Sequence, residues 1–203
     1  MIELLIATQN QGKRKELQNL FSQSRIDIKV YCLSDFGIDG DCPEDGQTFM
    51  ENAIFKSLYY GKYRPGFYII GDDSGLVVDV LGGEPGVYSA RYAGVGAGDQ
   101  KNTEKLLDAL KEKENRRARF VTAICLSKGG QVIETFSGEA EGVIIDEKRG
   151  TNGFGYDPVF YYPPLQKTFA QLTTEEKNSV SHRARAFRKL EAYLLERMQT
   201  KNL

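Results

Sequence analysis

The order of strand and helix signals along this chain predicts an α/β fold, with a mixed, twisted sheet flanked by helices. Two observations support this prediction. The chain opens with an apolar run, a short polar loop and a helical pattern, which together indicate the start of a β-α-β unit. Further on, two long runs rich in strand-forming residues flank Gly129-Gly130, which is typical of an antiparallel hairpin. A sheet that contains both kinds of connection is mixed.

The first half of the chain supplies two strands and two helices. The apolar run 2–7 reads as a buried strand, and the segment after its polar loop repeats apolar residues at helical spacing. Residues 26–33 predict a second strand. Thr48 and Glu51 form a capping-box pattern, which predicts that a helix starts there and reaches about Tyr63.

The second half of the chain begins with a third apolar run, 68–70, which stops just before Asp72 and Asp73. A shorter apolar run follows, so we expect a corner between two strands at these aspartates. A helix over about 99–113 precedes the long hairpin, and a glycine-rich loop then enters a further strand. The last helix, about 180–198, has one apolar face, which consists of Ala184, Phe187, Leu190, Leu194 and Met198.

Composition narrows the classes of function. The chain has 203 residues, which suits one domain or two interlocked lobes that share a core. Its 27 basic and 28 acidic residues give a net charge of −1, so we expect no nucleic-acid partner. No apolar run is long enough to span a membrane, and the N-terminus lacks the pattern of a signal peptide. Three widely spaced cysteines, with no CxxC motif, are typical of a reduced cytoplasmic protein.

The paired aspartates are the first candidate for chemistry. Adjacent like charges at the end of a buried run need a compensating cation. Two carboxylates at a strand end can bind Mg²⁺ through oxygen, and one of them can also orient or deprotonate a water molecule. The alternative is that Asp72 and Asp73 form an exposed turn without function.

The polar loop after the first strand is a candidate anion site. A helix that begins near Lys13 would point free backbone N–H groups and the positive end of its dipole at an anion. Lys13 adds a full charge, and Thr8 and Asn10 add side-chain donors. The loop does not match a Walker loop, because the first glycine is missing and Arg14 follows the lysine. An ordinary strand-to-helix turn with a solvated lysine is the alternative.

Two further segments could recognise a purine. In "GFGYDP", Phe154 and Tyr156 offer aromatic faces, and Asp157 offers an acceptor for a ring N–H. A glycine-flanked turn is the alternative for this segment. His182 and Arg183 are donors that suit the 6-keto oxygen of inosine or xanthine, whereas adenine presents a donor at that position. The alternative is a structural histidine beside an arginine that is only a surface charge.

Taken together, the motifs resemble those of one family. "ATQNQGKRKEL", "EDGQTFMENAIFK", "DDSGLVVDVLGGEPGVYSARYAG", "GFGYDPVF" and "LTTEEKNSVSHRARAF" occur in the order seen in the inosine/xanthosine triphosphate pyrophosphatases, and the resemblance extends from Leu5 to Phe187. It implies a hydrolase that uses Mg²⁺ to convert ITP, dITP and XTP into the nucleoside monophosphate and pyrophosphate. It also implies one domain over residues 1–203, with two lobes and the active site in the cleft between them. A homodimer is implied as well, and the segment "YSARYAG", which contains Arg91, resembles a loop near the substrate and the dimer interface.

The resemblance also assigns roles to particular residues. Asp73 is similar to the general base that activates water, and Ser74 to a hydroxyl that contacts the substrate. The residues that resemble the triphosphate cradle are Thr8, Asn10, Lys13, Lys56 and Lys177. The residues that resemble the metal site are Glu44, Asp72 and Asp73. The residues that resemble the base pocket are Phe154, Gly155, Tyr156 and Asp157, with His182 and Arg183 at the 6-keto edge.

The chain departs from the family pattern in one turn. The family often has two glutamates there, whereas this sequence reads Pro43-Glu44-Asp45-Gly46. Counting back from the helix start favours Glu44 as the metal ligand, and Asp45 is the alternative.

Two other functions are compatible with these motifs. A related pyrophosphatase could prefer modified pyrimidines, in which case a pyrimidine triphosphate would be hydrolysed in place of dITP. A non-catalytic nucleotide sensor could use the same phosphate cradle, and it would bind inosine triphosphate with Mg²⁺ without releasing pyrophosphate.

Overall fold

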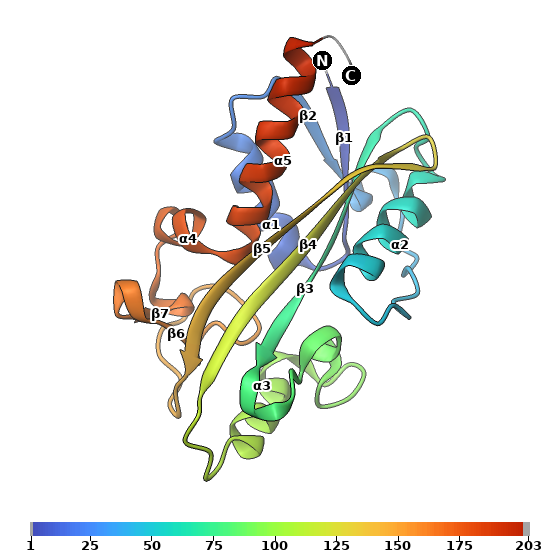
Figure 1. Ribbon diagram of the computed structural model, residues 1–203. Coiled ribbons are helices and arrows are strands. Elements are labelled where there is room, and N and C mark those ends of the chain that lie inside the picture. The colour runs from blue at the N-terminus through green and yellow to red at the C-terminus, as the bar shows by residue number, and fades with distance from the viewer. Residues whose placement is uncertain (1, 201–203) are drawn as a thin grey trace. The chain divides into compact units, whose positions relative to one another are not determined.

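The computed structural model describes residues 2–200, and its strands form a seven-stranded sheet with the order β2-β1-β3-β4-β5-β6-β7 (Figure 1). β1 pairs in parallel with β2 and with β3, whereas β5, β6 and β7 pair antiparallel. The predicted mixed sheet flanked by helices is therefore confirmed. The strands are β1 (Ile2–Ala7), β2 (Ile28–Cys32), β3 (Tyr68–Val78), β4 (Arg117–Lys128), β5 (Gln131–Ile144), β6 (Phe160–Tyr162) and β7 (Lys167–Thr168). The α-helices are α1 (Gln11–Ser22), α2 (Phe49–Gly61), α3 (Gly98–Ala109), α4 (Thr174–Val180) and α5 (His182–Gln199).

The chain divides into two compact units. The first unit contains the described residues up to Asp73, together with Thr122–Gly138 and the described residues from His182 onward. The second unit contains Ser74–Val121 and Glu139–Ser181. Because β3, β4 and β5 each contribute residues to both units, neither unit is a continuous segment of the sequence.

The core of the first unit follows the alternation of side chains along its strands. Leu4 and Ile70 lie in one cluster with Leu17 of α1 and Phe187 of α5. Their neighbours along the same strands, such as Ile69, belong to another cluster on the opposite face. That second cluster includes Tyr60 of α2, and α2 also contributes Ala53 to a third, smaller cluster.

The second unit has a core of its own that is rich in aromatic side chains. Leu76 and Val78 of β3 pack with Leu106 of α3. Phe120, Phe160 and Phe169 belong to the same cluster, with ring centroids 4.6 to 5.7 Å apart. Each of these three rings is less than a tenth exposed.

Local signals placed most elements correctly. The predicted capping box of Thr48 with Glu51 starts α2, and the long hairpin turns at Gly129-Gly130. A second capping box, of Thr173 with Glu176, starts α4. The apolar face expected for the last helix is buried apart from Met198, which is 37% exposed in the last turns of α5. No helix in the described part of the chain is both long and apolar enough to cross a membrane.

The corner predicted at the paired aspartates is wrong. β3 runs without interruption from Tyr68 to Val78, so Asp72 and Asp73 lie inside a strand. They are 0% and 4% exposed, respectively. A strand can bury two adjacent carboxylates only where each is paired with a cation. Both aspartates are paired with cationic side chains in this structure.

Candidate active site

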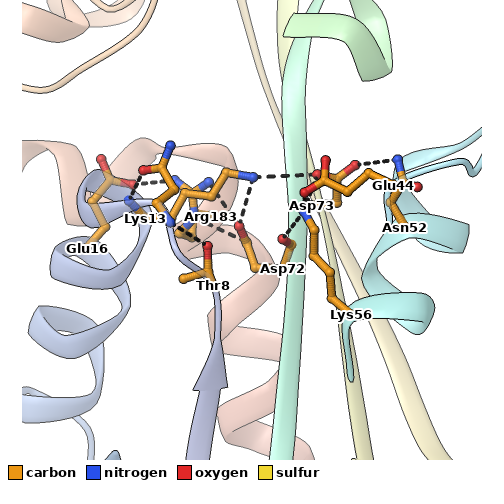
Figure 2. Close-up of polar contacts among 10 residues, drawn as sticks. Thr8, Lys13, Glu16, Glu44, Asn52, Lys56, Asp72, Asp73 and Arg183 are labelled. Atoms are coloured by element: carbon orange, nitrogen blue, oxygen red, sulfur yellow. Dashed lines mark hydrogen bonds and ion pairs between the residues drawn. The ribbon is translucent and has the colours of Figure 1, made fainter. Parts of the chain in front are cut away.

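Asp72 and Asp73 point to opposite faces of the sheet because side chains alternate along β3. Asp72 contacts residues of α1 and α5, and Asp73 contacts residues of α2 (Figure 2). The pairing of β1 with β3 ends at Ala7 and Gly71, just before the two aspartates. Lys13 of α1 contacts both carboxylates. Adjacent like charges are therefore separated by strand geometry and share one lysine.

Asp72 is enclosed by two cations. Nε and Nη2 of Arg183 donate to its two oxygens at 3.2 and 3.4 Å, and Nζ of Lys13 lies 3.4 Å from Oδ2. Burial alone would raise the pKa of Asp72, but the charges of Arg183 and Lys13 outweigh it and hold the pKa below its ordinary value. Asp72 is thus an ionised carboxylate in the interior of the first unit.

Asp73 receives contacts from three side chains. Oδ1 lies 2.9 Å from Nζ of Lys56 and 3.6 Å from Nζ of Lys13, and Oδ2 accepts a hydrogen bond of 3.1 Å from the amide of Asn52. Asn52 is 0% exposed and was not predicted as a site residue. Its position one turn before Lys56 on α2 is the sequence signal that could have identified it.

Glu44 joins the same cluster through Lys56. Oε1 of Glu44 lies 2.8 Å from Nζ of Lys56, so one ammonium group bridges Glu44 and Asp73. Asp45, the alternative considered for this turn, is exposed. The structure therefore brings Glu44 to the carboxylate cluster.

The two lysines of the cluster differ in the balance of forces on them. Burial lowers the pKa of Lys13, and the nearby carboxylates only partly compensate. Burial also acts against the charge of Lys56, but Asp73 and Glu44 outweigh it and raise the pKa of Lys56. Lys56 is therefore held firmly by carboxylates, whereas the charge of Lys13 is incompletely compensated.

Gly71 lets α2 approach β3 closely enough to form this cluster. A Cβ atom at Gly71 would fall far inside contact distance of the carbonyl oxygen of Ala53, and 2.8 Å from the backbone nitrogen of Ser57. The backbone of α2 thus packs directly on β3, one residue before Asp72. This approach places Asn52 and Lys56 beside Asp73.

The loop before α1 is held by its own hydrogen bonds. Asn10 is the N-cap of α1, and its Oδ1 accepts a hydrogen bond of 3.0 Å from the backbone N–H of Lys13. The N–H of Asn10 donates to Oγ1 of Thr8 at 3.2 Å. The expected strand-to-helix turn is present, with the helix starting at Gln11. The role of this loop as a phosphate cradle stays a prediction.

The chemistry of the cluster fits a divalent cation. Glu44 and Asp73 converge on one ammonium group, and the contacts of Asp72 with cations, at 3.2 to 3.4 Å, are longer than the ~2.7–2.9 Å of close charge-assisted hydrogen bonds. Carboxylate oxygens are the ligands that Mg²⁺ prefers. As they stand, no three His, Cys, Asp or Glu side chains among residues 2–200 are arranged to hold a metal ion. The carboxylates therefore suit Mg²⁺ as ligands, and the ammonium group of Lys56 lies between two of them, Glu44 and Asp73.

The second unit contains the predicted aromatic loop. Oδ2 of Asp157 accepts hydrogen bonds from Nζ of Lys177 and from the backbone N–H of Phe154. Nζ of Lys177 also lies 5.3 Å from the ring centroid of Phe154. The structure thus brings three of the predicted substrate-binding residues together.

Tyr156 ties this loop to the core of the second unit. Its side chain is 4% exposed, and its hydroxyl donates to the carbonyl oxygen of Ser89 at 2.8 Å. Burial raises the pKa of the Tyr156 hydroxyl, so it stays a donor. The "GFGYDP" motif is therefore anchored to the 3₁₀ helix Gly86–Arg91.

Two residues at the start of α3 were not predicted for the site. Oδ2 of Asp99 accepts a hydrogen bond of 2.7 Å from the backbone N–H of Gly155. Asn102 accepts from the N–H of Ala93 and donates to the carbonyl of Ala90. Both residues hold loops against α3 through hydrogen bonds to residues that are distant in the sequence. No local sequence pattern predicts these contacts.

The remaining predicted residues lie in both units. His182 and Arg183 open α5 in the first unit and are 4% and 1% exposed. Ser74 lies on β3 in the second unit and is half-buried. The guanidinium of Arg91 lies 5.3 Å from the ring centroid of Tyr88.

Residues 4–193 match the model of the Ham1 family. A "dITP/XTP pyrophosphatase" of Bacillus licheniformis is 48% identical over 196 residues, which cover 96% of this chain and 98% of that protein. The protein of the same name from Bacillus subtilis is 47% identical with the same coverage. Among solved structures, the Ham1 protein of Staphylococcus aureus matches with a TM-score of 0.84 and 46% identity over 96% of this chain and 98% of that one. A HAM1 protein from Coxiella burnetii matches with a TM-score of 0.86 and 39% identity over 97% and 100%.

Proposed function

The chain belongs to the Ham1 family, and we propose that it hydrolyses ITP, dITP and XTP to the nucleoside monophosphate and pyrophosphate. The near full-length relatives named for dITP and XTP support this activity. Such hydrolysis would remove deaminated purine nucleotides from the pool before they are incorporated into DNA or RNA. The proposal includes Mg²⁺ as the cofactor and the cytoplasm as the location.

The observation that supports the chemistry best is the environment of Asp73. Its carboxylate is almost fully buried, and it contacts Lys56, Lys13 and Asn52. In the proposed reaction, Asp73 accepts a proton from the water that attacks the α-phosphorus. The lysines that contact this carboxylate would bind the phosphate oxygens of a substrate when it is present.

Residues of the first unit would hold the triphosphate and the metal. Glu44, Asp72 and Asp73 would hold Mg²⁺, which supplies a positive charge that stabilises the leaving pyrophosphate. The incompletely compensated charge of Lys13 favours an anionic partner such as a phosphate. Thr8 and Asn10 would add donors from the loop before α1, and Lys56 would add a second cation.

Residues of the second unit would hold the purine. The ring of Phe154 would stack on the base, with Gly155 and Tyr156 forming the rest of the loop, while Asp157 would meet its polar edge. Lys177 would join the residues that hold the triphosphate. Ser74 would contact the substrate through its hydroxyl. The donors for the 6-keto oxygen would be His182 and Arg183.

The proposal also includes a homodimer. The 3₁₀ helix Gly86–Arg91 presents Tyr88, whose side chain is 59% exposed and is packed by Arg91. Large exposed aromatic side chains are typical of protein interfaces. We therefore expect this helix to contribute to the interface between two copies of the chain.

The first test is pyrophosphate release from dITP, XTP, dATP, dGTP and dUTP, each with and without Mg²⁺. We expect Mg²⁺-dependent release that strongly favours dITP and XTP. Release mainly from dUTP would indicate a pyrimidine enzyme, and binding without any release would indicate a sensor.

The catalytic role of Asp73 has a matched test. Asp73→Asn should lower kcat roughly 10²–10⁴-fold, the usual contribution of a general base, while triphosphate binding stays measurable by calorimetry. Asp79→Asn is the control. Asp79 is an aspartate directly after the same strand, where it opens a 3₁₀ helix and forms an ion pair with Arg119. Full activity of Asp73→Asn would rule out the general-base assignment.

A further inference from the structure

Glu16 has no role in the proposed reaction, yet it takes part in a buried network of charges with residues that do. Nη1 of Arg183 donates a hydrogen bond to Oε2 of Glu16, while Nε and Nη2 of the same guanidinium face Asp72. Lys13, which contacts Asp72, lies three residues before Glu16 on α1. Lys13, Asp72, Arg183 and Glu16 therefore form a chain of alternating charge that starts and ends on one helix (Figure 2).

This chain is almost closed to solvent. The side chains of Asp72 and Arg183 are 0% and 1% exposed, and those of Lys13 and Glu16 are 11% and 17% exposed. In such surroundings a charged hydrogen bond is much stronger than at the surface, so the position of one member affects the next. Glu16 is thus close enough to influence Asp72 through Arg183.

The distances show how Arg183 is shared. A bidentate arginine–carboxylate pair in close contact has N···O distances of ~2.7–2.9 Å. The two hydrogen bonds of Arg183 with Asp72 measure 3.2 and 3.4 Å, and the third nitrogen of the guanidinium, Nη1, donates a hydrogen bond to Glu16. The guanidinium is therefore divided between two carboxylates and does not close on Asp72.

We propose that Glu16 is a positioning residue that holds Arg183 back from Asp72 and so keeps the Asp72 carboxylate available to the divalent cation. Without Glu16, Arg183 closes on Asp72 and competes with the metal. The loss of the negative charge of Glu16 also disfavours a cation nearby, so geometry and electrostatics act in the same direction. This inference rests on the proposed function, because it takes Asp72 as a metal ligand.

The test compares Glu16→Gln with the wild-type protein. Each protein is titrated with Mn²⁺ alone, and binding is measured by calorimetry or by electron paramagnetic resonance. Glutamine keeps an acceptor for Arg183 but removes the charge. We expect the dissociation constant for Mn²⁺ to rise roughly tenfold, which is the scale of one hydrogen bond to a charged group. At saturating Mg²⁺, kcat should change less than about threefold, and Glu16→Asp should restore part of the metal affinity.

The matched control is Glu191→Gln. Glu191 is a glutamate of α5 that accepts a hydrogen bond of 3.2 Å from the backbone N–H of Arg25, so it also ties α5 to the chain after α1. Its replacement should leave Mn²⁺ affinity unchanged. A merely structural role of Glu16 would reduce kcat at saturating metal and leave the affinity for metal unaltered.

A crystal structure of Glu16→Ala, which removes the acceptor for Arg183 together with the charge, provides a readout that does not depend on activity. The contacts of Arg183 with Asp72 should shorten to about 2.8 Å. Unchanged distances would overturn the inference whatever the metal titration shows, and so would an unchanged affinity in a wild-type enzyme that binds Mn²⁺. If the wild-type protein neither binds Mn²⁺ nor releases pyrophosphate, the proposed function fails, and with it the role of Glu16 toward the metal.

Discussion

Lys13 in the first unit and Lys177 in the second are buried to the same extent but are held differently. Both side chains are 11% exposed, and both contact a carboxylate that is almost fully buried. Lys177 lies 2.5 Å from Oδ2 of Asp157, whereas Lys13 lies 3.4 and 3.6 Å from two carboxylates. Each of those two carboxylates has a further cation, Arg183 or Lys56.

This difference indicates two uses of a buried lysine. The close pair of Lys177 with Asp157 stabilises the fold of the aromatic loop. The two carboxylates that Lys13 contacts each have another cation nearby, Arg183 or Lys56. Burial also lowers the pKa of Lys13. A lysine of that kind contributes little to stability and is ready to bind an anion, which agrees with the proposed role of Lys13 in holding phosphate.

The largest effect on stability should come from Lys177→Met. Removing one partner of a buried ion pair typically costs about 3–5 kcal/mol, because it removes the cation next to a desolvated carboxylate. We expect a loss of that size in the free energy of unfolding, measured by urea denaturation. The double variant with Asp157→Asn should recover part of the loss, since the charge that lost its partner is then removed.

An intermediate effect is expected from Gly71→Ala. The added Cβ would collide with the backbone of α2, so the helix must move away from β3. Overpacking of this kind usually costs about 1–3 kcal/mol. Because Asn52 and Lys56 move with the helix, pyrophosphate release should fall as well.

Gly66→Ala is the control for Gly71→Ala. A Cβ at Gly66 would meet nothing within 4 Å, and its backbone lies outside the left-handed region. Its stability and activity should match those of the wild-type protein. Equal effects of the two substitutions would show that the close approach of α2 at Gly71 is unimportant.

The smallest effect on stability is expected from Lys13→Met. Asp72 keeps Arg183 and Asp73 keeps Lys56, so the free energy of unfolding should change by less than about 1 kcal/mol. Activity should nevertheless be lost, since the proposed phosphate contact is gone. A loss of stability as large as that of Lys177→Met would remove the distinction between the two lysines.

The pH dependence of stability sharpens the same comparison. The folded protein lowers the pKa of Lys13 from its ordinary value of 10.5, so at neutral pH its charged form is less favourable in the folded state. As pH rises from the folded pKa toward 10.5, the unfolded chain binds more protons than the folded protein, and stability increases. The wild-type protein should therefore gain stability relative to Lys13→Met between these two pH values. No difference between their pH profiles would contradict the incomplete compensation of Lys13.

The sequence by itself determined the elements whose signals are local. The capping box of Thr48 with Glu51 and the Gly129-Gly130 turn each involve residues at most four positions apart, so the chain specifies them without the rest of the fold. The same holds for the apolar face of α5, whose period is readable along one segment. The family resemblance added the candidate site residues, and residues 4–193 match the Ham1 family model.

Only the tertiary structure decided how the charges are shared. The sequence predicted a corner at Asp72 and Asp73, because an isolated strand does not bury two adjacent carboxylates. The continuous strand is possible because Arg183, 111 residues away, and Lys56, 16 or 17 residues away, supply cations on opposite faces of the sheet. The contact of Arg183 with Glu16 spans 167 residues. No local pattern encodes such contacts, since they exist only once the strands are in register and α1, α2 and α5 are packed on them.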